Sequence, residues 1–333
     1  MNGREERERK YNIMINNNLK DKPCDVAGFN NFLKGNTSVS TRYAYINDVI
    51  RFLERYNKPL SELLYSDFLD YISEIEYKED GTPTTSSYKI AVYSALKKFC
   101  EYLYITKKIP ENYMLSIKRP KFTETQKTLK KREIGFLTKD EVDIMLKGAK
   151  EDIKNIKYPK EKIAAERDLL IVKLFLTTGI RCSAMQGLDV SDIDFETNQI
   201  FVTDKGDKVS CFELSAKIVK ELKRWLLQRD ELVEEYGLDT DALFITASES
   251  GRMSTKSIYR AAEKMDKYVK GKNITPHKLR ATYGTMLYDE TKDLIFVQRC
   301  MGHAKSETTT LYIRGKNNAK TKGSKIMSRR LGL

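Results

Sequence analysis

The chain has 333 residues, a formal net charge of +13 and five cysteines. This length is enough for two domains with separate cores, and the excess of positive charge predicts a negatively charged partner. The cysteines are odd in number and lack C-x-x-C spacing, which excludes a disulfide framework and a cysteine zinc site, and no apolar run is long enough for a signal peptide or a membrane span. We therefore expect a cytoplasmic protein with no membrane segment.

The excess charge is concentrated in two segments. Residues 118–132 carry seven basic residues and one acid, and residues 314–333 carry seven basic residues and no acid. A single lysine-rich run is often no more than a solvated surface. Because these two runs flank the region that contains both histidines of the chain, they favour nucleic acid as the partner.

The first third of the chain predicts a small helical domain. Apolar residues recur at helical spacing in residues 40–56, 60–75 and 86–104, with a short helix near 111–115. A loop around residues 79–83 separates the second helix from the third. We expect a polar extension over residues 1–26, a helical domain over 27–117 and a basic linker over 118–136.

A second domain is predicted over residues 137–316, followed by a basic tail over residues 317–333. It begins with a capping box, Thr138 to Glu141, and a helix over 162–178 that Gly179 ends. Its other predicted elements are β-like runs over 195–203 and 208–214 around a hairpin turn, a helix over 216–236, a short strand over 243–246 and helices to about residue 314. The fold class is therefore mainly α, with a small β-hairpin or sheet in the second domain.

The second domain also holds the residues suited to phosphate chemistry. His277 and Arg280 follow Thr275-Pro276, a helix start, and their spacing of three places them on one helical face. Arg181 follows the helix stop at Gly179, where free backbone amides favour anions. The remaining candidates are Lys205 at the hairpin turn, His303, and Tyr312 nine residues after His303.

These residues, in this order, resemble the tyrosine recombinase family, which includes phage integrases, mobile-element integrases and Xer-type resolvases. The resemblance covers about residues 30–315, and the helical domain is similar to the family's core-binding domain. The matching motifs are T-G-I-R ending at Arg181, Lys205 in a hairpin 24 residues later, H-x-L-R from His277 to Arg280, M-G-H ending at His303, and Tyr312.

The resemblance implies a role for each of these residues. Tyr312 is expected to attack the scissile phosphate of duplex DNA and form a 3′-phosphotyrosyl bond, so rejoining needs no ATP. Arg181, Arg280 and His303 are expected to stabilise the transition state, with Lys205 protonating the 5′ oxygen and His277 assisting the tyrosine. No metal or other cofactor is expected, because the arginines take the place of a metal.

Plainer interpretations exist for single residues of this set. A histidine and an arginine three apart on a helix are most often a surface pair, and one tyrosine of 19 is most often half-buried packing. Lys208 lies in the same hairpin and is the alternative to Lys205, which the spacing favours. It is the joint match in order and spacing that favours catalysis.

The chain departs from the family at one position of the first arginine motif. Members usually carry an acid three residues after this arginine, suited to orienting it, whereas this chain has Ala184. Either Gln186 or Asp192 substitutes for the acid, or Arg181 is held less rigidly.

Rival functions share part of this pattern. They are a type IB topoisomerase that relaxes DNA strands, a non-catalytic DNA-binding regulator on the same fold, and a zinc hydrolase, whose H-E-x-x-H spacing is absent. Recombination is favoured by the short helical domain and the basic tail. The family implies a nucleoid-associated homotetramer that clamps two specific DNA sites between its domains and passes through a Holliday junction. An accessory DNA-bending or directionality protein is possible, and mobile-element integration and Xer-type resolution are both compatible with the residues.

Overall fold

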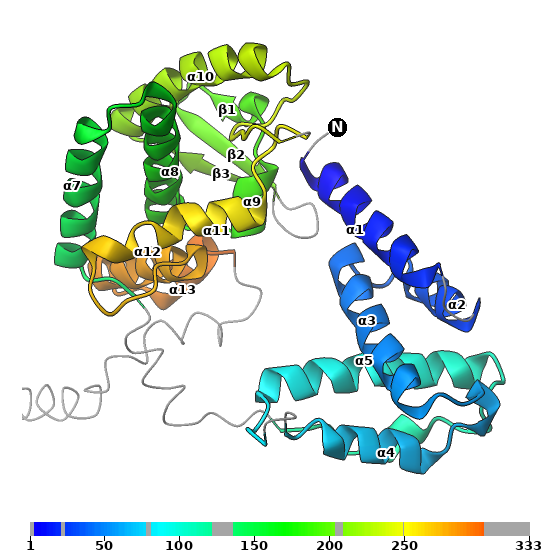
Figure 1. Ribbon diagram of the computed structural model, residues 1–333. Coiled ribbons are helices and arrows are strands. Elements are labelled where there is room, and N and C mark those ends of the chain that lie inside the picture. Colours follow the sequence, from blue (N-terminus) through cyan, green and yellow to red (C-terminus); the bar gives the residue numbers. More distant parts are fainter. Residues whose placement is uncertain are drawn as a thin grey trace, which may run out of the picture. The chain divides into compact units, whose positions relative to one another are not determined.

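The computed structural model describes residues 3–20, 24–77, 81–121, 136–203, 209–248 and 250–302. The chain divides into two compact units between residues 124 and 125, inside the segment predicted as a linker. Both units are mainly helical, as predicted (Figure 1). No helix within the described ranges is both long and apolar enough to cross a bilayer.

All regular elements among the described residues of the first unit are helices, joined by turns and loops, and one isolated β-bridge is present. Its elements are α1 Gly3–Leu19, α2 Cys24–Leu33, α3 Val39–Tyr56, η1 Leu60–Glu62, α4 Tyr65–Glu74, α5 Ser86–Ile105 and η2 Tyr113–Leu115. Ser38 caps α3, and Thr85 caps α5, each by accepting a backbone N–H three residues later. The core includes the fully buried rings of Phe52, Phe68 and Phe99.

The polar extension predicted before residue 27 contains a helix that its composition does not indicate. Ile15 of α1 is 1% exposed and packs with Val26 and Ile46 in a small apolar cluster. Asn18 Nδ2 also donates to Asn47 Oδ1 over 2.7 Å. Contacts with α3 thus hold α1, and the boundary expected at residue 26 falls inside α2.

The second unit contains the remaining helices and the only regular sheet among the described residues. Its helices are α7 Lys139–Asn155, α8 Pro159–Thr178, α9 Cys182–Gly187, η3 Val190–Asp192, α10 Ala216–Tyr236, α11 Thr255–Glu263, η4 Asp266–Tyr268, α12 Pro276–Thr291 and α13 Leu294–Cys300. The predicted capping box of α7 is confirmed: Thr138 N donates to Glu141 Oε2 over 2.7 Å, and Glu141 N donates to Thr138 Oγ1 over 3.3 Å.

The sheet has the order β1-β2-β3 and is antiparallel throughout. Its strands are β1 Ile193–Asp194, β2 Gln199–Thr203 and β3 Val209–Glu213. Thr203 pairs with Val209, so the predicted hairpin is confirmed, and its turn, with Lys205 and Lys208, lies outside the described residues. The strand expected over 243–246 is not formed: within it only Ile245 pairs, in a single bridge with Arg252, and the preceding Ala242 forms a single bridge with Asp189.

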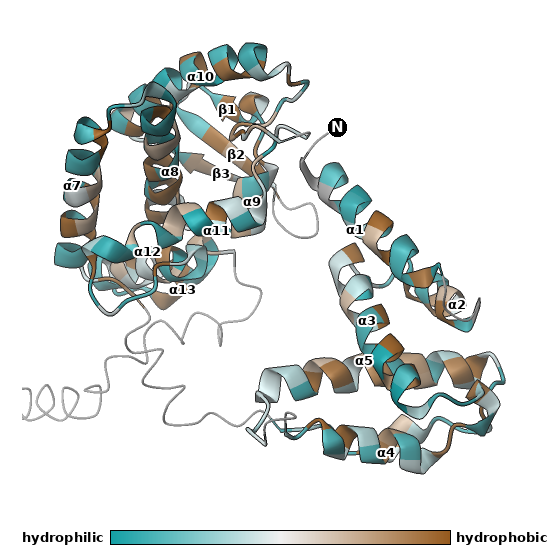
Figure 2. Ribbon diagram, in the orientation of Figure 1, coloured by the Kyte–Doolittle hydropathy of each residue, from teal (hydrophilic) through white to brown (hydrophobic). Residues whose placement is uncertain are grey.

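Helix α8 is the centre of the second unit. It contacts α7, α10, α11 and α12, which surround it in Figure 1. Its apolar residues include the fully buried Ile171, Leu174 and Phe175, and Figure 2 shows the hydrophobic residues that run along it. Because a helix packed on several sides is held firmly in place, its C-terminal end is a rigid support for the residues that follow.

Candidate functional site

The C-terminal end of α8 makes a sharp turn at Gly179. Gly179 has a φ of 63°, and its backbone N–H donates to the Phe175 carbonyl oxygen as the helix ends. A Cβ on Gly179 would lie 2.2 Å from Cδ1 of Tyr283 on α12, so the turn needs glycine both for its backbone conformation and for its close packing. The sequence pattern indicated the helix stop but gave no signal for the contact with Tyr283.

Arg280 lies against this turn. It is carried by α12, which begins with Pro276 in the first turn and Thr275 as the cap, accepting from Lys278 N. The residue is 6% exposed. Its Nη1 donates to the Gly179 carbonyl oxygen and its Nη2 to the Met301 carbonyl oxygen. A buried guanidinium with carbonyl partners is a rigid, permanently charged group.

Arg181 approaches the same place from the other side of the turn. It is the residue before α9, partly exposed, with an extended backbone. Its Nη2 donates to the Gly302 carbonyl oxygen over 3.2 Å. The two arginines, 99 positions apart in the sequence, therefore converge on the consecutive carbonyls of Met301 and Gly302.

His277 lies one helical turn before Arg280 on α12. Its side chain keeps access to solvent, but the surrounding protein removes enough water to lower its pKa, and the charge of Arg280 lowers that pKa further. The neutral imidazole is therefore favoured near pH 7, in the form that can accept a proton.

Three of the six predicted catalytic residues lie outside the described residues: Lys205, His303 and Tyr312. His303 directly follows Gly302, whose carbonyl accepts from Arg181. The structure thus brings Arg181 and Arg280 together, and places His277 on the helix that carries Arg280. Most of the predicted basic linker and the whole basic tail are also outside the described residues.

Tyr283, which no sequence motif indicated, packs beside Arg280 on α12. Burial raises the pKa of Tyr283 to about 12, with the Cys300 thiol beside it. Its ring also lies against Gly179. A phenol that stays protonated and packs against the turn serves to position it, so Tyr283 is not suited to act as the nucleophile.

Ala184 replaces the acid of the family pattern, and its surroundings are apolar. The residue is 5% exposed and belongs to the core of the second unit. Of the two substitutes considered, Asp192 is engaged elsewhere: its Oδ2 accepts from Asp189 N over 2.8 Å, and burial raises its pKa. For Gln186, it is the backbone carbonyl oxygen that accepts a hydrogen bond, from Arg252 over 3.2 Å.

The described residues give no metal site, and the best-defined cavity lies away from the arginine pair. Within the described residues, no group of three or more His, Cys, Asp or Glu side chains is arranged to hold a metal ion. A cavity of about 380 Å³ lies between α7, α8 and α10, and its lining, which includes Lys173 and Trp225, shares no residue with the arginine site. Of the two arginines, Arg181 is partly exposed, whereas Arg280 is buried.

The sequence is similar to that of known DNA recombinases. The model of the phage integrase family matches residues 135–319. A tyrosine recombinase XerC of Thermodesulfovibrio yellowstonii is 30% identical over 285 residues, which cover 84% of this chain and 86% of that protein. A tyrosine recombinase XerS of Streptococcus pneumoniae is 36% identical over 149 residues, 44% of this chain and 41% of that protein.

Solved structures share the fold. The XerH site-specific recombinase, in a post-cleavage complex with a palindromic difH substrate, superposes with a TM-score of 0.67 at 22% identity, covering 95% of this chain and 88% of that chain. A lambda integrase dimer bound to a COC′ core site gives a TM-score of 0.58 at 16% identity, covering 87% of this chain and 94% of that chain. The chain therefore belongs to the phage integrase family of tyrosine recombinases, enzymes of site-specific DNA recombination.

Proposed function

We propose that the paired guanidinium groups of Arg181 and Arg280 bind the scissile phosphate of a specific DNA site. The observation that carries this role is their convergence on the consecutive Met301 and Gly302 carbonyls, which brings a buried and a partly exposed positive charge to one segment of backbone. A pentacovalent phosphate gathers negative charge on its nonbridging oxygens during attack. Two planar donors fixed beforehand stabilise that charge without reorganising, which is why such groups accelerate phosphoryl transfer.

Tyr312 is the proposed nucleophile. Attack of its hydroxyl oxygen on phosphorus forms the phosphotyrosyl bond to the 3′ end and breaks the bond to the 5′ oxygen, which leaves with a proton from Lys205. His277, with its lowered pKa, takes up the tyrosine proton, and His303 adds a hydrogen bond to the phosphate. The phosphodiester energy is retained in the protein–DNA bond, so the reverse attack by a 5′ hydroxyl rejoins a strand.

The partner is double-stranded DNA at two recombination sites. The family relationship and the net charge of +13 support this assignment, and the XerH complex with difH DNA is a precedent on the same fold. We propose a homotetramer on DNA, in which pairs of protomers cleave in turn through a Holliday junction. Integration of a mobile element and Xer-type resolution both fit this chemistry, and short repeats in the DNA flanking the gene would identify the first.

A nicked duplex that traps the covalent intermediate tests the proposal. The duplex carries the flanking repeat sequence, with a nick placed just downstream of the scissile phosphate, so that the short fragment carrying the freed 5′ hydroxyl diffuses away and cannot rejoin. The wild-type chain is expected to form a denaturation-resistant adduct, and Tyr312→Phe to bind the duplex with similar affinity and form none. An adduct with Tyr312→Phe would remove Tyr312 from the role, and relaxation of plasmids without exchange of strands between sites would indicate a topoisomerase.

A further inference from the structure

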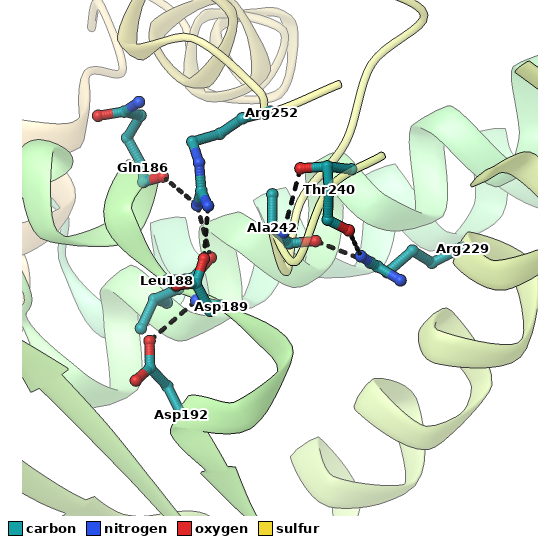
Figure 3. A network of polar contacts seen from close by, with 8 residues as sticks. All are labelled: Gln186, Leu188, Asp189, Asp192, Arg229, Thr240, Ala242 and Arg252. Atoms are coloured by element: carbon teal, nitrogen blue, oxygen red, sulfur yellow. Dashed lines mark hydrogen bonds and ion pairs between the residues drawn. The ribbon is translucent and has the colours of Figure 1, made fainter. Parts of the chain in front are cut away.

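Arg252 is a buried arginine outside the site described above. It is 4% exposed, and Figure 3 shows its guanidinium beside groups of Gln186, Leu188 and Asp189, where α9 ends. Nη1 donates to the carbonyl oxygens of Gln186 and Leu188 over 3.2 and 3.0 Å, and Nη2 lies 2.5 Å from Asp189 Oδ1. Burying a guanidinium is costly, so three partners on one short segment form a specific clamp.

The clamp holds one end of the helix whose other end is Arg181. Helix α9 contains six residues, which corresponds to roughly 9 Å of helix. The Arg181 carbonyl oxygen accepts from the backbone N–H groups of Ala184 and Met185, both over 2.9 Å. Because backbone hydrogen bonds join Arg181 to this single short helix, we expect a displacement at Gln186 to be transmitted to Arg181.

Arg252 is itself fixed to the body of the unit. It forms an antiparallel bridge with Ile245, and Met253 N donates to the Phe244 carbonyl oxygen over 2.9 Å. The Leu188 carbonyl that Arg252 contacts also accepts from Leu243 N over 2.9 Å. The clamp therefore joins the end of α9 to Arg252 and Met253, whose backbone is hydrogen-bonded to residues 243–245.

A second buried arginine contacts residues 240–242, which precede the residues bridged to Arg252, but it makes no hydrogen bond with α9. Arg229 of α10 donates from Nε to the Ala242 carbonyl oxygen and from Nη2 to the Thr240 carbonyl oxygen, each over 2.7 Å (Figure 3). Its remaining contact is Nη1 with Asp230 Oδ1 over 2.9 Å. Arg229 is 6% exposed, so it matches Arg252 in burial and in its use of carbonyl partners.

We propose that Arg252 is a positioning residue for catalysis: by clamping the C-terminal end of α9, it sets the place of the Arg181 guanidinium at the scissile phosphate. This role rests on the proposed phosphate contact of Arg181. It also explains how the arginine is held in a chain where Ala184 stands in place of the family's acid: α9 is fixed through its backbone from the far end.

A double-mutant cycle on cleavage rate tests this role. Arg252→Lys keeps the charge beside Asp189 but loses the planar fork that reaches two carbonyls and a carboxylate together. Because a displacement of about 1 Å costs on the order of 100-fold, we expect Arg252→Lys to slow single-turnover cleavage of the nicked duplex by roughly 10- to 100-fold. Affinity for a half-site duplex is expected to stay within about threefold, since one phosphate contact of many is disturbed.

The cycle separates positioning from general stability. In an Arg181→Ala background, Arg252→Lys is expected to cause little further loss, because the group that it positions is gone. Arg229→Lys is the matched control: it is expected to lower Tm while its effect on cleavage is the same with and without Arg181. A full, additive loss from Arg252→Lys in the Arg181→Ala background would overturn the proposal, as would wild-type cleavage by a folded Arg252→Lys chain.

Two further outcomes are distinguishable. Wild-type cleavage by Arg181→Ala itself would refute the proposed role of Arg181 rather than that of Arg252. If Arg252→Lys does not fold at the assay temperature, Asp189→Asn enters the same cycle, since it removes only the charge opposite Arg252. Asp189→Asn is then expected to slow cleavage with the same dependence on Arg181, and an additive effect would overturn the proposal.

Discussion

Arg280 donates a hydrogen bond to the carbonyl oxygen of Gly179, a residue 101 positions earlier in the chain. The contact ties α12 to the turn that ends α8, two residues before Arg181. Tyr283, one helical turn after Arg280, packs its ring where a Cβ of residue 179 would be. We therefore expect the backbone of this one glycine to set the separation between the two arginines that we propose for catalysis.

Gly179→Ala is therefore expected to damage both stability and cleavage. A left-handed backbone costs a side-chain-bearing residue roughly 1–2 kcal/mol, and the overlap with Tyr283 adds roughly 1–3 kcal/mol of strain. Gly237→Ala is the control, because Gly237 also ends a helix, α10, with a φ of 60°, but a methyl group on it would have no neighbouring atom within 4 Å. Tm from thermal unfolding and the rate of single-turnover cleavage are measured for both variants.

The comparison of these glycines isolates the packing effect. Gly237→Ala is expected to lose only the backbone contribution to stability and to cleave DNA at the wild-type rate when folded. If both substitutions lower Tm equally and neither slows cleavage, Tyr283 yields without moving Arg280, and the turn does not set the arginine separation.

The two arginines are expected to differ in their effect on stability but not on catalysis. Removing either guanidinium withdraws a preorganised donor from the phosphate, which typically slows the step on the order of 100- to 1000-fold. Arg280→Ala also removes the buried contacts to Gly179 and Met301, so its Tm is expected to fall, whereas Arg181→Ala is expected to unfold near the wild-type temperature. Cleavage, half-site binding and Tm are measured for both. Equal losses in binding and cleavage would make the arginines simple anchors.

The lowered pKa of His277 gives a prediction about pH. Since desolvation and Arg280 disfavour the imidazolium, His277 is expected to stay neutral as the pH falls below the ordinary histidine value of 6.5. Proton acceptance at Tyr312 therefore persists at mildly acidic pH and is lost only as the pH falls through the lowered pKa. The same shift makes the folded state progressively less stable as the pH falls below 6.5, because His277 is harder to protonate in the folded chain than in the unfolded one.

An NMR titration measures this pKa directly. The chain has two histidines, so His303→Gln leaves the resonances of His277 alone. A value at or above 6.5 would contradict the prediction. In cleavage assays, His277→Gln is expected to be slow at every pH, without the fall in rate at acidic pH that the wild-type chain shows. If that fall is unchanged in the variant, it is due to the protonation of another group.

Much of the catalytic unit was predictable because its signals are local. Thr138 and Glu141 form the capping box that their spacing indicates, and Gly179 ends α8 where the pattern placed the stop. The helix that carries His277 and Arg280 begins at Pro276, as the Thr-Pro pair indicates. Helix starts and stops such as these depend on a few consecutive residues, so they can be predicted from the local sequence.

The remaining features depend on contacts between distant residues. Helix α1 has no apolar face of its own, and it is held by Ile15 and by side chains of α3. No strand forms over 243–246, because the two bridges in this region, from Ala242 to Asp189 and from Ile245 to Arg252, lead to two different segments of the chain. The clamp of Arg252 on α9 gave no sequence signal, since a single arginine in a loop is ordinarily solvated.

The hairpin turn between β2 and β3 allows a test of the general acid. Lys205→Ala is expected to slow cleavage of an ordinary duplex but not of one whose scissile 5′ oxygen is replaced by sulfur, because a thiolate leaves without a proton. Lys208→Ala is the matched control, with the same charge removed from the same turn. Rescue of Lys208→Ala alone by the sulfur substrate would assign the acid to Lys208.

The basic tail is predicted to couple protomers. Residues 314–333 contain seven basic residues, and they also include the apolar Ile326, Met327, Leu331 and Leu333. A wholly solvated segment gains nothing from these apolar groups, whereas a segment that docks on a neighbouring protomer buries them. Truncation after Lys316 is therefore expected to leave binding to one half-site largely intact and to weaken cooperative binding to a full site.

Gel-shift titrations on half-sites and full sites separate docking from electrostatics. If the tail only attracts DNA, its removal weakens both titrations alike, and the loss shrinks as salt is added because fewer counterions are released. If the tail docks, the half-site curve shifts little and the full-site curve loses its steepness. Replacing Leu331 and Leu333 by serine in the full-length chain keeps every positive charge, so a loss of cooperativity in that variant assigns the coupling to apolar contact, and normal cooperativity rejects it.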